Sequence, residues 1–315
     1  CANMIAINKC FPDLKTFGLC HWGEGTAEML AKDLGENIED IDYLCAGINH
    51  MAFYQKFEKR ANGKPAEDLY PRLKDIADKI VNGEMVSSRS KKKTDYSGKV
   101  LHEKVRYEIL RRFSYFVTES SEHFAEYVPW FIKQNRQDVI DKYEIPIEEY
   151  IDRCERNIKL WDQLEKDMTP IHNEPLKRSN EYASFIMDGV ANNNEVTINA
   201  NVMNDGYIDN LPSNCCVEVP CIINAKGITP QKFGRLPEHL AALMRTNINV
   251  QILTAEAAMT KKREHIYHAA LLDPLTAANL TIDEIYSMTD KMIEAHGLSL
   301  IHISEPTRLL SIAVA

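Results

Sequence analysis

The sequence predicts a mixed α/β protein whose first 50 residues include part of a parallel sheet. Two short apolar runs, residues 15–19 and 41–45, have the composition and length of buried strands. The stretch between them, residues 26–34, has the helical period and is entered through the glycine-rich turn Gly23–Gly25. A helix between two strands is typical of parallel pairing. The less regular order of patterns further along favours an α+β arrangement for the rest of the chain.

The remaining elements follow from the spacing of apolar residues. The chain opens in a helical pattern that runs from Met4 to Phe11. Later stretches carry the helical or the strand period in turn, and they predict a strand over 51–59, helices over 70–82, 102–113 and 148–166, strands over 196–202 and 216–223, and helices over 237–261 and 282–296. Residues 115–130 are rich in aromatic and titratable groups without a clean period, which is typical of a surface loop or a site.

Composition excludes several classes of function. The chain has 315 residues, of which 44% are hydrophobic and 26% charged, as in ordinary globular proteins. Its net charge of −9 argues against a nucleic-acid partner, and the short basic run 89–93 indicates an exposed turn. No apolar stretch is long enough to span a bilayer and no secretory signal is seen, so we expect a cytoplasmic protein. Cys215, Cys216 and Cys221 are expected to be buried, reduced thiols.

Both ends of the sequence are unusual. The chain does not start with methionine, and no glycine-rich phosphate loop follows a strand anywhere in it. Residues 299–315 resemble a translated sequencing-adapter read-through, and we expect them to be a non-native tail. We therefore base functional predictions on the residues before this tail.

A thiol and two imidazoles stand at the ends of the first two predicted strands. Cys20 and His21 follow one strand, and His50 follows the other after a short interval. Ligands bind at the carboxyl ends of strands in open α/β sheets, and thiolate and imidazole are the ligands of borderline transition metals. The pattern predicts a metal site, with core packing of the same side chains as the alternative.

Longer strings of residues resemble one known family. The chain is similar to glycoside hydrolase family 4, nearest its α-galactosidase (melibiase) branch, from residue 2 to about residue 297. The strings that carry the resemblance are residues 18–21, 45–53, 117–131, 204–212, 217–220 and 239–250. The resemblance implies a remnant of a Rossmann-like NAD-binding domain over 1–50, followed over 51–298 by a catalytic domain like that of lactate and malate dehydrogenases.

The resemblance also implies the cofactors and the reaction. Family members use NAD and a divalent metal, usually Mn²⁺, to oxidise C3 of the sugar, remove the proton from C2, eliminate the glycosidic oxygen and add water. This differs from the paired-carboxylate chemistry of most glycosidases. Since the nucleotide loop is missing from this sequence, the chain is expected to be a fragment that is inactive alone, and the full-length protein a dimer or tetramer.

Roles for individual residues are carried over from the family motifs. Cys20 and His50 match the metal ligands, and Asn49 matches a position expected to contact substrate hydroxyls. His21 stands where some branches carry an aspartate as the general acid, and a histidine suits that role near neutral pH. Alternatively, Asn49 is a capping or turn residue, and His21 acts only indirectly, by adjusting the properties of Cys20 as a metal ligand.

The general base is predicted from the segment before residue 130. Tyr127 is the first choice, because a tyrosine serves as base in related branches and a nearby metal would lower its pKa. Glu122 and His123 are alternatives for the base and are otherwise expected to contact substrate. A packed aromatic ring is the structural alternative for Tyr127.

The resemblance leaves more than one substrate sugar open. Related α-galactosidases usually continue the Cys-His pair with Ser-Val-Gln-Gly, whereas this chain has Trp22–Gly25. An α-galactoside is the first choice of substrate, with α-galacturonides and α-glucosides as alternatives. Two other classes of protein stay open. One is a hydroxy-acid dehydrogenase. The other is a structural protein in which Cys45 and His21 join Cys20 and His50 to form a closed zinc site.

Overall fold

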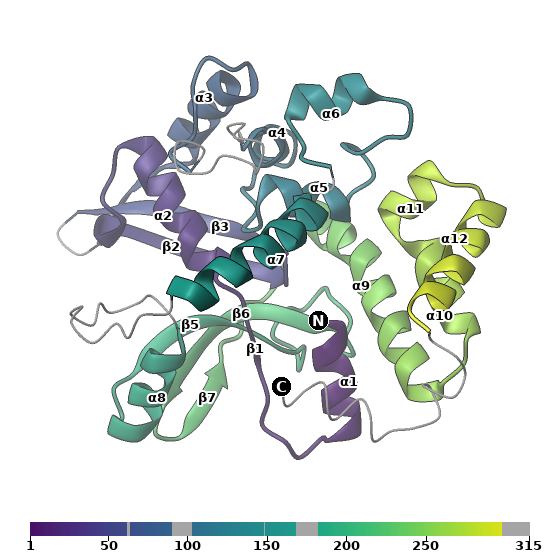
Figure 1. Cartoon of the computed structure of the whole chain (residues 1–315). Helices are drawn as coiled ribbons and strands as arrows, with labels where there is room; N and C mark the ends of the chain where they lie inside the picture. The colour runs from purple at the N-terminus through teal and green to yellow at the C-terminus, as the bar shows by residue number, and fades with distance from the viewer. Residues whose placement is uncertain (62–63, 90–102, 148, 168–181, 298–315) are drawn as a thin grey trace.

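The computed structural model describes residues 1–61, 64–89, 103–147, 149–167 and 182–297 (Figure 1). Its centre is one sheet with the strand order β1-β5-β6-β2-β3-β4, and β7 pairs with β6. The strands are β1 (Gly18–Leu19), β2 (Ile41–Ile48), β3 (Met51–Ala61), β4 (Lys64–Asp68), β5 (Val196–Met203), β6 (Cys216–Asn224) and β7 (Gly227–Pro230). The mixed α/β class predicted from the sequence is confirmed.

The predicted parallel pairing within residues 1–50 is wrong. Strands β1 and β2 are not neighbours; β1 pairs with β5, and β2 pairs with β3 and β6, each time antiparallel. The physical reason is that β3 and β6 occupy the two edges of β2 and leave none for β1. In the short turn after Ile48, His50 takes a positive φ of 64° and folds β3 directly back on β2. A connection this short permits only a hairpin. The sheet therefore draws strands from both sides of residue 50.

Helices cover the sheet on both faces. They are α1 (Ala2–Cys10), α2 (Trp22–Leu34), α3 (Tyr70–Val81), α4 (Lys104–Phe113), α5 (Ser121–Tyr127), α6 (Gln137–Tyr143), α7 (Glu149–Asp167), α8 (Tyr182–Asn192), α9 (Glu238–Thr260), α10 (Glu264–Leu272), α11 (Pro274–Asn279) and α12 (Ile282–Ala295), with a 3-10 turn at Ile38–Asp40. Figure 1 shows α10, α11 and α12 gathered beside α9.

Two apolar cores follow from the alternation of side chains along the strands. On one face, Ile48, Val217 and Val219 pack with residues of α5 and α9. On the other face, Cys45 and Tyr54 pack with residues of α2, α3 and α4. Burial of these apolar side chains is the main stabilising contribution to such a layered fold. Cys215, Cys216 and Cys221 are buried free thiols, as predicted.

Three local predictions need correction. Helix α2 begins at Trp22 rather than at residue 26, so Gly23 and Gly25 lie in its first turn. The segment 115–130, which lacks a clean period, contains α5, whose N-cap Ser120 accepts a hydrogen bond from the His123 backbone N–H. Arg89 is not an exposed residue: its guanidinium lies 3.1 Å from Glu103 and stacks 4.0 Å over the ring of Trp22. Residues 90–93 and the expected tail 299–315 lie outside the described residues.

Candidate functional site

Three potential metal ligands meet at one point of the structure. The donor atoms of Cys20, His50 and Glu119 all lie within 4.8 Å of one another. Cys20 lies between β1 and α2, His50 in the turn between β2 and β3, and Glu119 two residues before α5. The first two were predicted from the sequence, whereas Glu119 was missed. One sulfur, one nitrogen and one oxygen donor form a set that suits a borderline divalent cation.

Backbone pairing brings the Glu119 segment to His50. Val117 forms an antiparallel bridge with Phe53, and the backbone N–H of Thr118 donates to the carbonyl of Ala52 at 2.9 Å. These contacts extend the sheet beyond β3, directly after the turn that holds His50. Glu119, the next residue, therefore points its carboxylate toward the turn.

Helix α2 is fixed to the same segment by a buried side chain. The hydroxyl of Thr26 donates to the carbonyl of Thr118 at 2.6 Å. The guanidinium of Arg106, which is fully buried, donates to that carbonyl at 3.2 Å and to the Thr26 hydroxyl at 2.8 Å. Its charge is balanced by Glu103 at 2.8 Å. This network holds the first turn of α2, and hence Cys20, beside Glu119.

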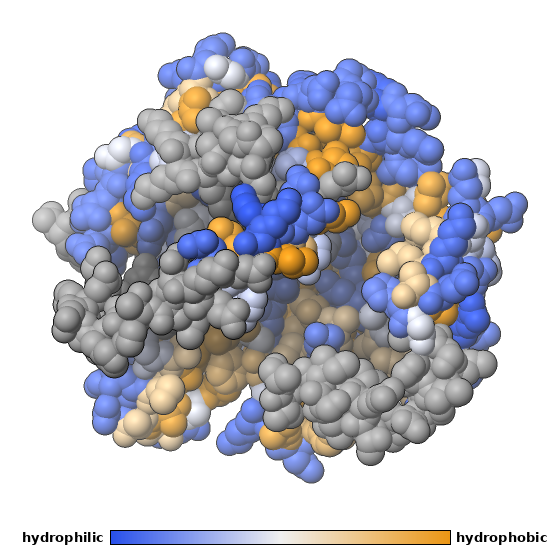
Figure 2. All heavy atoms as spheres, in the orientation of Figure 1, coloured by the Kyte–Doolittle hydropathy of each residue, from blue (hydrophilic) through white to orange (hydrophobic). Residues whose placement is uncertain are grey.

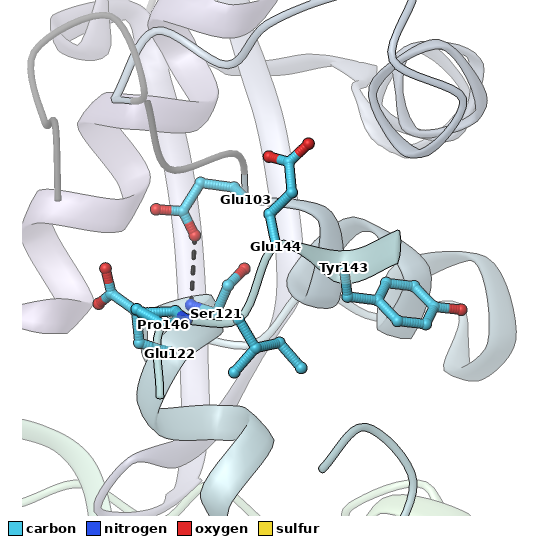
Figure 3. A pocket seen from close by; sticks show the side chains of 7 residues that line it. Glu103, Ser121, Glu122, Tyr143, Glu144 and Pro146 are labelled. Atoms are coloured by element: carbon cyan, nitrogen blue, oxygen red, sulfur yellow. Dashed lines mark hydrogen bonds between the residues drawn. The ribbon is translucent and has the colours of Figure 1, made fainter. Parts of the chain in front are cut away.

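Glu103 also lines a small cavity beside the start of α5 (Figure 3). There the Ser121 backbone N–H donates to the Glu103 carboxylate at 3.2 Å. Glu122 lines this cavity, whose volume of about 10 Å³ is roughly the space of one water molecule. The structure thus places Glu122 at this cavity, whereas Cys20, His50 and Glu119 form the ligand cluster.

The carboxylate of Glu119 lacks a hydrogen-bond donor at one oxygen. Its Oε1 accepts from the Ser120 backbone N–H at 2.8 Å. Its buried Oε2 has no hydrogen-bond partner, although His50 Nε2 lies 3.2 Å away, because the two groups are not aligned for a hydrogen bond. A buried carboxylate oxygen without a donor is costly unless a cation lies beside it. The arrangement fits a metal ion placed between Glu119 and His50.

Burial sets the protonation of the other two candidate ligands. Burial lowers the pKa of His50, which keeps its imidazole neutral and able to bind a metal. Burial, with the nearby Glu218 and Glu119 carboxylates, raises the pKa of the Cys20 thiol to about 11. A bound cation would reverse this effect by stabilising the thiolate. Metal binding at this site is therefore coupled to loss of the Cys20 proton.

A second buried carboxyl group, Glu218 on β6, lies behind the metal ligands. Hydrogen bonds from the Asn49 and Asn201 side chains reach it, the latter at 3.5 Å. Asn49 also hydrogen-bonds Cys20, so it joins the thiol to Glu218. Burial raises the pKa of Glu218 to about 7 in spite of these bonds. Glu218 was not predicted from the sequence. The feature that could have indicated it is a charged residue within an otherwise apolar strand.

Tyr127 and His123 from α5 complete one side of the site. The Tyr127 hydroxyl lies 3.0 Å from His50 Nδ1, which leaves the Nε2 atom of His50 for Glu119 or a metal. The ring of His123 stacks on that of His50 with centroids 6.3 Å apart, and its Nδ1 lies 3.2 Å from Glu126. Burial and Glu119 raise the pKa of Tyr127 to about 12, whereas the hydrogen bond to Glu126 raises the pKa of His123.

His21 lies at the edge of this group. Its exposed ring stacks on Tyr182 of α8, with centroids 5.1 Å apart and planes only 7° from parallel. The structure thus brings together Cys20, His50, Asn49, Tyr127 and His123, and it adds Glu119 and Glu218. It places His21 next to Cys20 along the chain but against α8.

Comparison with known proteins gives consistent matches. Residues 45–276 match the family described as "Family 4 glycosyl hydrolase C-terminal domain". An α-galactosidase of Bacillus subtilis (strain 168) is 42% identical over 287 residues, which cover 91% of this chain and 62% of the relative. An α-galactosidase of Rhizobium meliloti (strain 1021) is 31% identical, with coverages of 94% and 59%. The chain thus spans about three fifths of the length of these relatives.

A solved structure shares the fold. A 6-phospho-α-glucosidase from gut microorganisms, determined in complex with NAD and Mn²⁺, superposes with a TM-score of 0.71 at 18% identity. The match covers 93% of this chain and 64% of that protein.

Proposed function

The chain belongs to glycoside hydrolase family 4, and from this premise we propose that the intact protein is an α-glycosidase that uses NAD and a divalent metal, with α-galactosides as substrates. The family resemblance predicted from the sequence is confirmed by the match over residues 45–276 and by the two α-galactosidases. The choice of galactose is supported by the 42% identity to one of them, compared with 25% to an α-galacturonidase of Thermoanaerobacter italicus.

The observation that carries the proposal is the cluster of Cys20, His50 and Glu119 with its unpartnered carboxylate oxygen. These residues fit a divalent metal, and we assign them as its protein ligands. When bound, the ion would act as a Lewis acid toward sugar hydroxyls and help to acidify the C2 proton. Three protein ligands leave positions for substrate, as in catalytic rather than closed structural sites.

A structural zinc site is less well supported. Such a site needs four protein ligands, and the cluster among the described residues has three. Cys45, one of the two ligands expected to complete a closed site with Cys20 and His50, instead accepts a hydrogen bond from the Asn199 amide at 2.8 Å. His21, the other candidate, stacks on Tyr182.

Tyr127 is proposed as the base that removes the C2 proton. Its hydroxyl is held at 3.0 Å from His50 Nδ1, so it lies beside the metal ligand rather than on it. With a pKa of about 12 the hydroxyl is protonated near neutral pH, and a cation beside it is needed to favour the phenolate. Asn49 and His123 are proposed to bind hydroxyls of the sugar that undergoes reaction.

His21 is proposed as the acid that protonates the departing glycosidic oxygen. The stacked ring of Tyr182 fixes the plane of its imidazole. Its exposure on the side of α8 allows a substrate to reach it. A histidine can exchange this proton with water between turnovers near neutral pH.

NAD would accept and return the hydride at C3 of the sugar. We find no glycine-rich phosphate loop after a strand in the sequence, so we assign no residue to the dinucleotide and derive no step through it. The domain division near residue 50 stays a proposal, as does a location in the cytoplasm. No helix in the described ranges is long and apolar enough to cross a membrane.

Assembly into a dimer or tetramer is also proposed. Helix α7 exposes Ile158 at 72% and Trp161 at 69%, and α8 exposes Met187 at 71%. Figure 2 shows hydrophobic side chains on the visible surface over α8 and β7. Large exposed apolar side chains that gather on a surface favour association with a partner.

The test is cleavage of aryl α-galactosides by the intact protein with and without NAD and Mn²⁺. We expect turnover only with both, without net accumulation of NADH, and loss of turnover in Cys20→Ser. Cys215→Ser, in a buried cysteine outside the cluster, is the matched control. Activity that survives removal of both cofactors would refute the proposal, and net NADH formation would indicate a dehydrogenase. Aryl α-glucosides and α-galacturonides compared side by side would identify the sugar.

A further inference from the structure

A second cavity lies on the sheet beside α8. Its volume is about 300 Å³, at the lower end of the range of small-molecule sites. Aromatic rings from Tyr43, Tyr182 and Phe185 form part of its wall, and Asn199 and Glu24 supply polar groups. This combination of ring faces with hydrogen-bonding groups suits a ligand that has both apolar faces and hydroxyls.

The cavity and the candidate metal centre share one face of the sheet. In the register of β5 and β6, Asn201 pairs with Glu218 and Asn199 pairs with Pro220. Side chains two residues apart on a strand point to the same face, about 7 Å apart. Glu218 is bonded to Asn49 at the metal centre, whereas Pro220 and Asn199 line the cavity. The two sites are therefore neighbours along these strands.

The first turn of α2 connects the same two sites. Cys20 contributes to the metal centre, and His21 stacks on Tyr182 in the cavity wall. Two residues later, a Cβ atom added at Gly23 would lie 3.1 Å from the Asn199 amide nitrogen, which is tighter than about nine in ten Cβ contacts. This close approach keeps the start of α2 against the cavity. The imidazole of His21 thus stands between the metal ligand and the cavity.

We propose that this cavity binds the leaving group of the substrate, a neutral sugar unit attached to the bond that is cleaved. The inference rests on the proposed glycosidase function and identifies where the second half of the substrate lies. Tyrosine and phenylalanine rings pack against the apolar faces of a pyranose, while amide and carboxylate groups bind its hydroxyls. Among the described residues, the lining contains the carboxylate of Glu24 and no lysine or arginine, which favours a neutral over a phosphorylated leaving group.

The position of His21 agrees with this assignment. A glycosidic oxygen lies between the ring held at the metal and the departing sugar, and the acid must reach that oxygen. His21 occupies the corresponding place between Cys20 and Tyr182. A ligand in the cavity would therefore place its linking oxygen near the His21 imidazole.

The experiment compares two substrates on the intact enzyme loaded with NAD and Mn²⁺. One is a disaccharide in which α-galactose is linked to glucose, and the other is α-galactosyl fluoride, whose leaving group is a single atom. Phe185→Ala removes a ring that is 39% exposed, and Thr197→Trp places a bulky ring in the lining of the cavity. Val190→Ala, an apolar truncation on the same helix but outside the lining, is the matched control.

We expect both cavity variants to lower kcat/KM for the disaccharide by about tenfold or more and to keep the value for the fluoride within about twofold. The control variant should keep kcat/KM for both substrates close to that of the parent enzyme. An equal loss of kcat/KM on the two substrates, or no loss on either, would overturn the inference. Cofactor-dependent cleavage by the parent enzyme would in that case still support the proposed function. A parent enzyme that cleaves neither substrate would refute the function, and the inference with it.

Discussion

Glu218→Gln should raise the free energy of unfolding of the metal-free protein at pH 8 by about 3 kcal/mol. Burial raises the pKa of Glu218 from 4.5 to about 7, so the folded protein keeps this proton over a range in which the unfolded chain releases it. The folded state then binds more protons than the unfolded state, and stability falls as the pH rises from about 4.5 through 7. Since one pKa unit is worth about 1.4 kcal/mol, the full loss is about 3 kcal/mol. Glutamine has no proton to lose.

The assay is urea unfolding at pH 4, 6 and 8 in the presence of a chelator, with the variant compared with the parent at each pH. The difference should be close to zero at pH 4, where the carboxyl group is protonated in both states, and should grow through pH 6 to its full value at pH 8. Glu39→Gln, at an exposed position, is the matched control and should change little at any pH. A Glu218 variant that is no more stable than the parent at pH 8 would refute the reasoning.

Three further predictions concern the metal and the base. Glu119→Gln should weaken Mn²⁺ binding at least tenfold by calorimetry, because a carboxylate ligand is lost, whereas Glu126→Gln should bind Mn²⁺ like the parent. Binding of Mn²⁺ should tighten about tenfold per pH unit between pH 7 and 8, since the Cys20 thiol, with a pKa of about 11, must lose its proton, and this slope should vanish in Cys20→Ala. Tyr127→Phe should lower kcat by about a hundredfold or more in steady-state assays without weakening Mn²⁺ binding.

Each of these three predictions would be contradicted by a specific result. Unchanged Mn²⁺ affinity in Glu119→Gln would remove Glu119 from the site. An affinity that does not depend on pH would mean that the Cys20 thiol is not a ligand. Full activity in Tyr127→Phe would assign the base to another group.

The elements of the fold were largely predictable from local patterns, but the pairing of the strands was not. The apolar run at 41–45 correctly indicated β2, and the alternation over 51–59 indicated β3. Their antiparallel pairing depends on the turn at His50, where a non-glycine residue takes a positive φ. Such a conformation has no reliable signature in the sequence, so the return of β3 to one edge of β2 was not foreseen. The strand–helix–strand order of residues 15–45 suggested instead a parallel pair between the first two strands.

Only some of the residues of the candidate site were predictable, because others reach it through strand pairing. Cys20 and His50 have donor chemistry that stands out at the ends of apolar runs. Glu119 is separated from His50 by 69 positions and is one carboxylate among many, so only the pairing of Val117 with Phe53 brings it into the site. Glu218 carried a stronger signal, because a charged residue in the middle of an apolar strand needs a partner or a function.

The most direct test of the metal centre is a crystal structure of the intact protein with Mn²⁺, in which anomalous scattering locates the ion. The account predicts a peak at bonding distance from Cys20 Sγ, His50 Nε2 and Glu119 Oε2, with Tyr127 still on His50 Nδ1. A peak bound by other residues, or an ion that leaves Cys20 and Glu119 outside its coordination sphere, would contradict it.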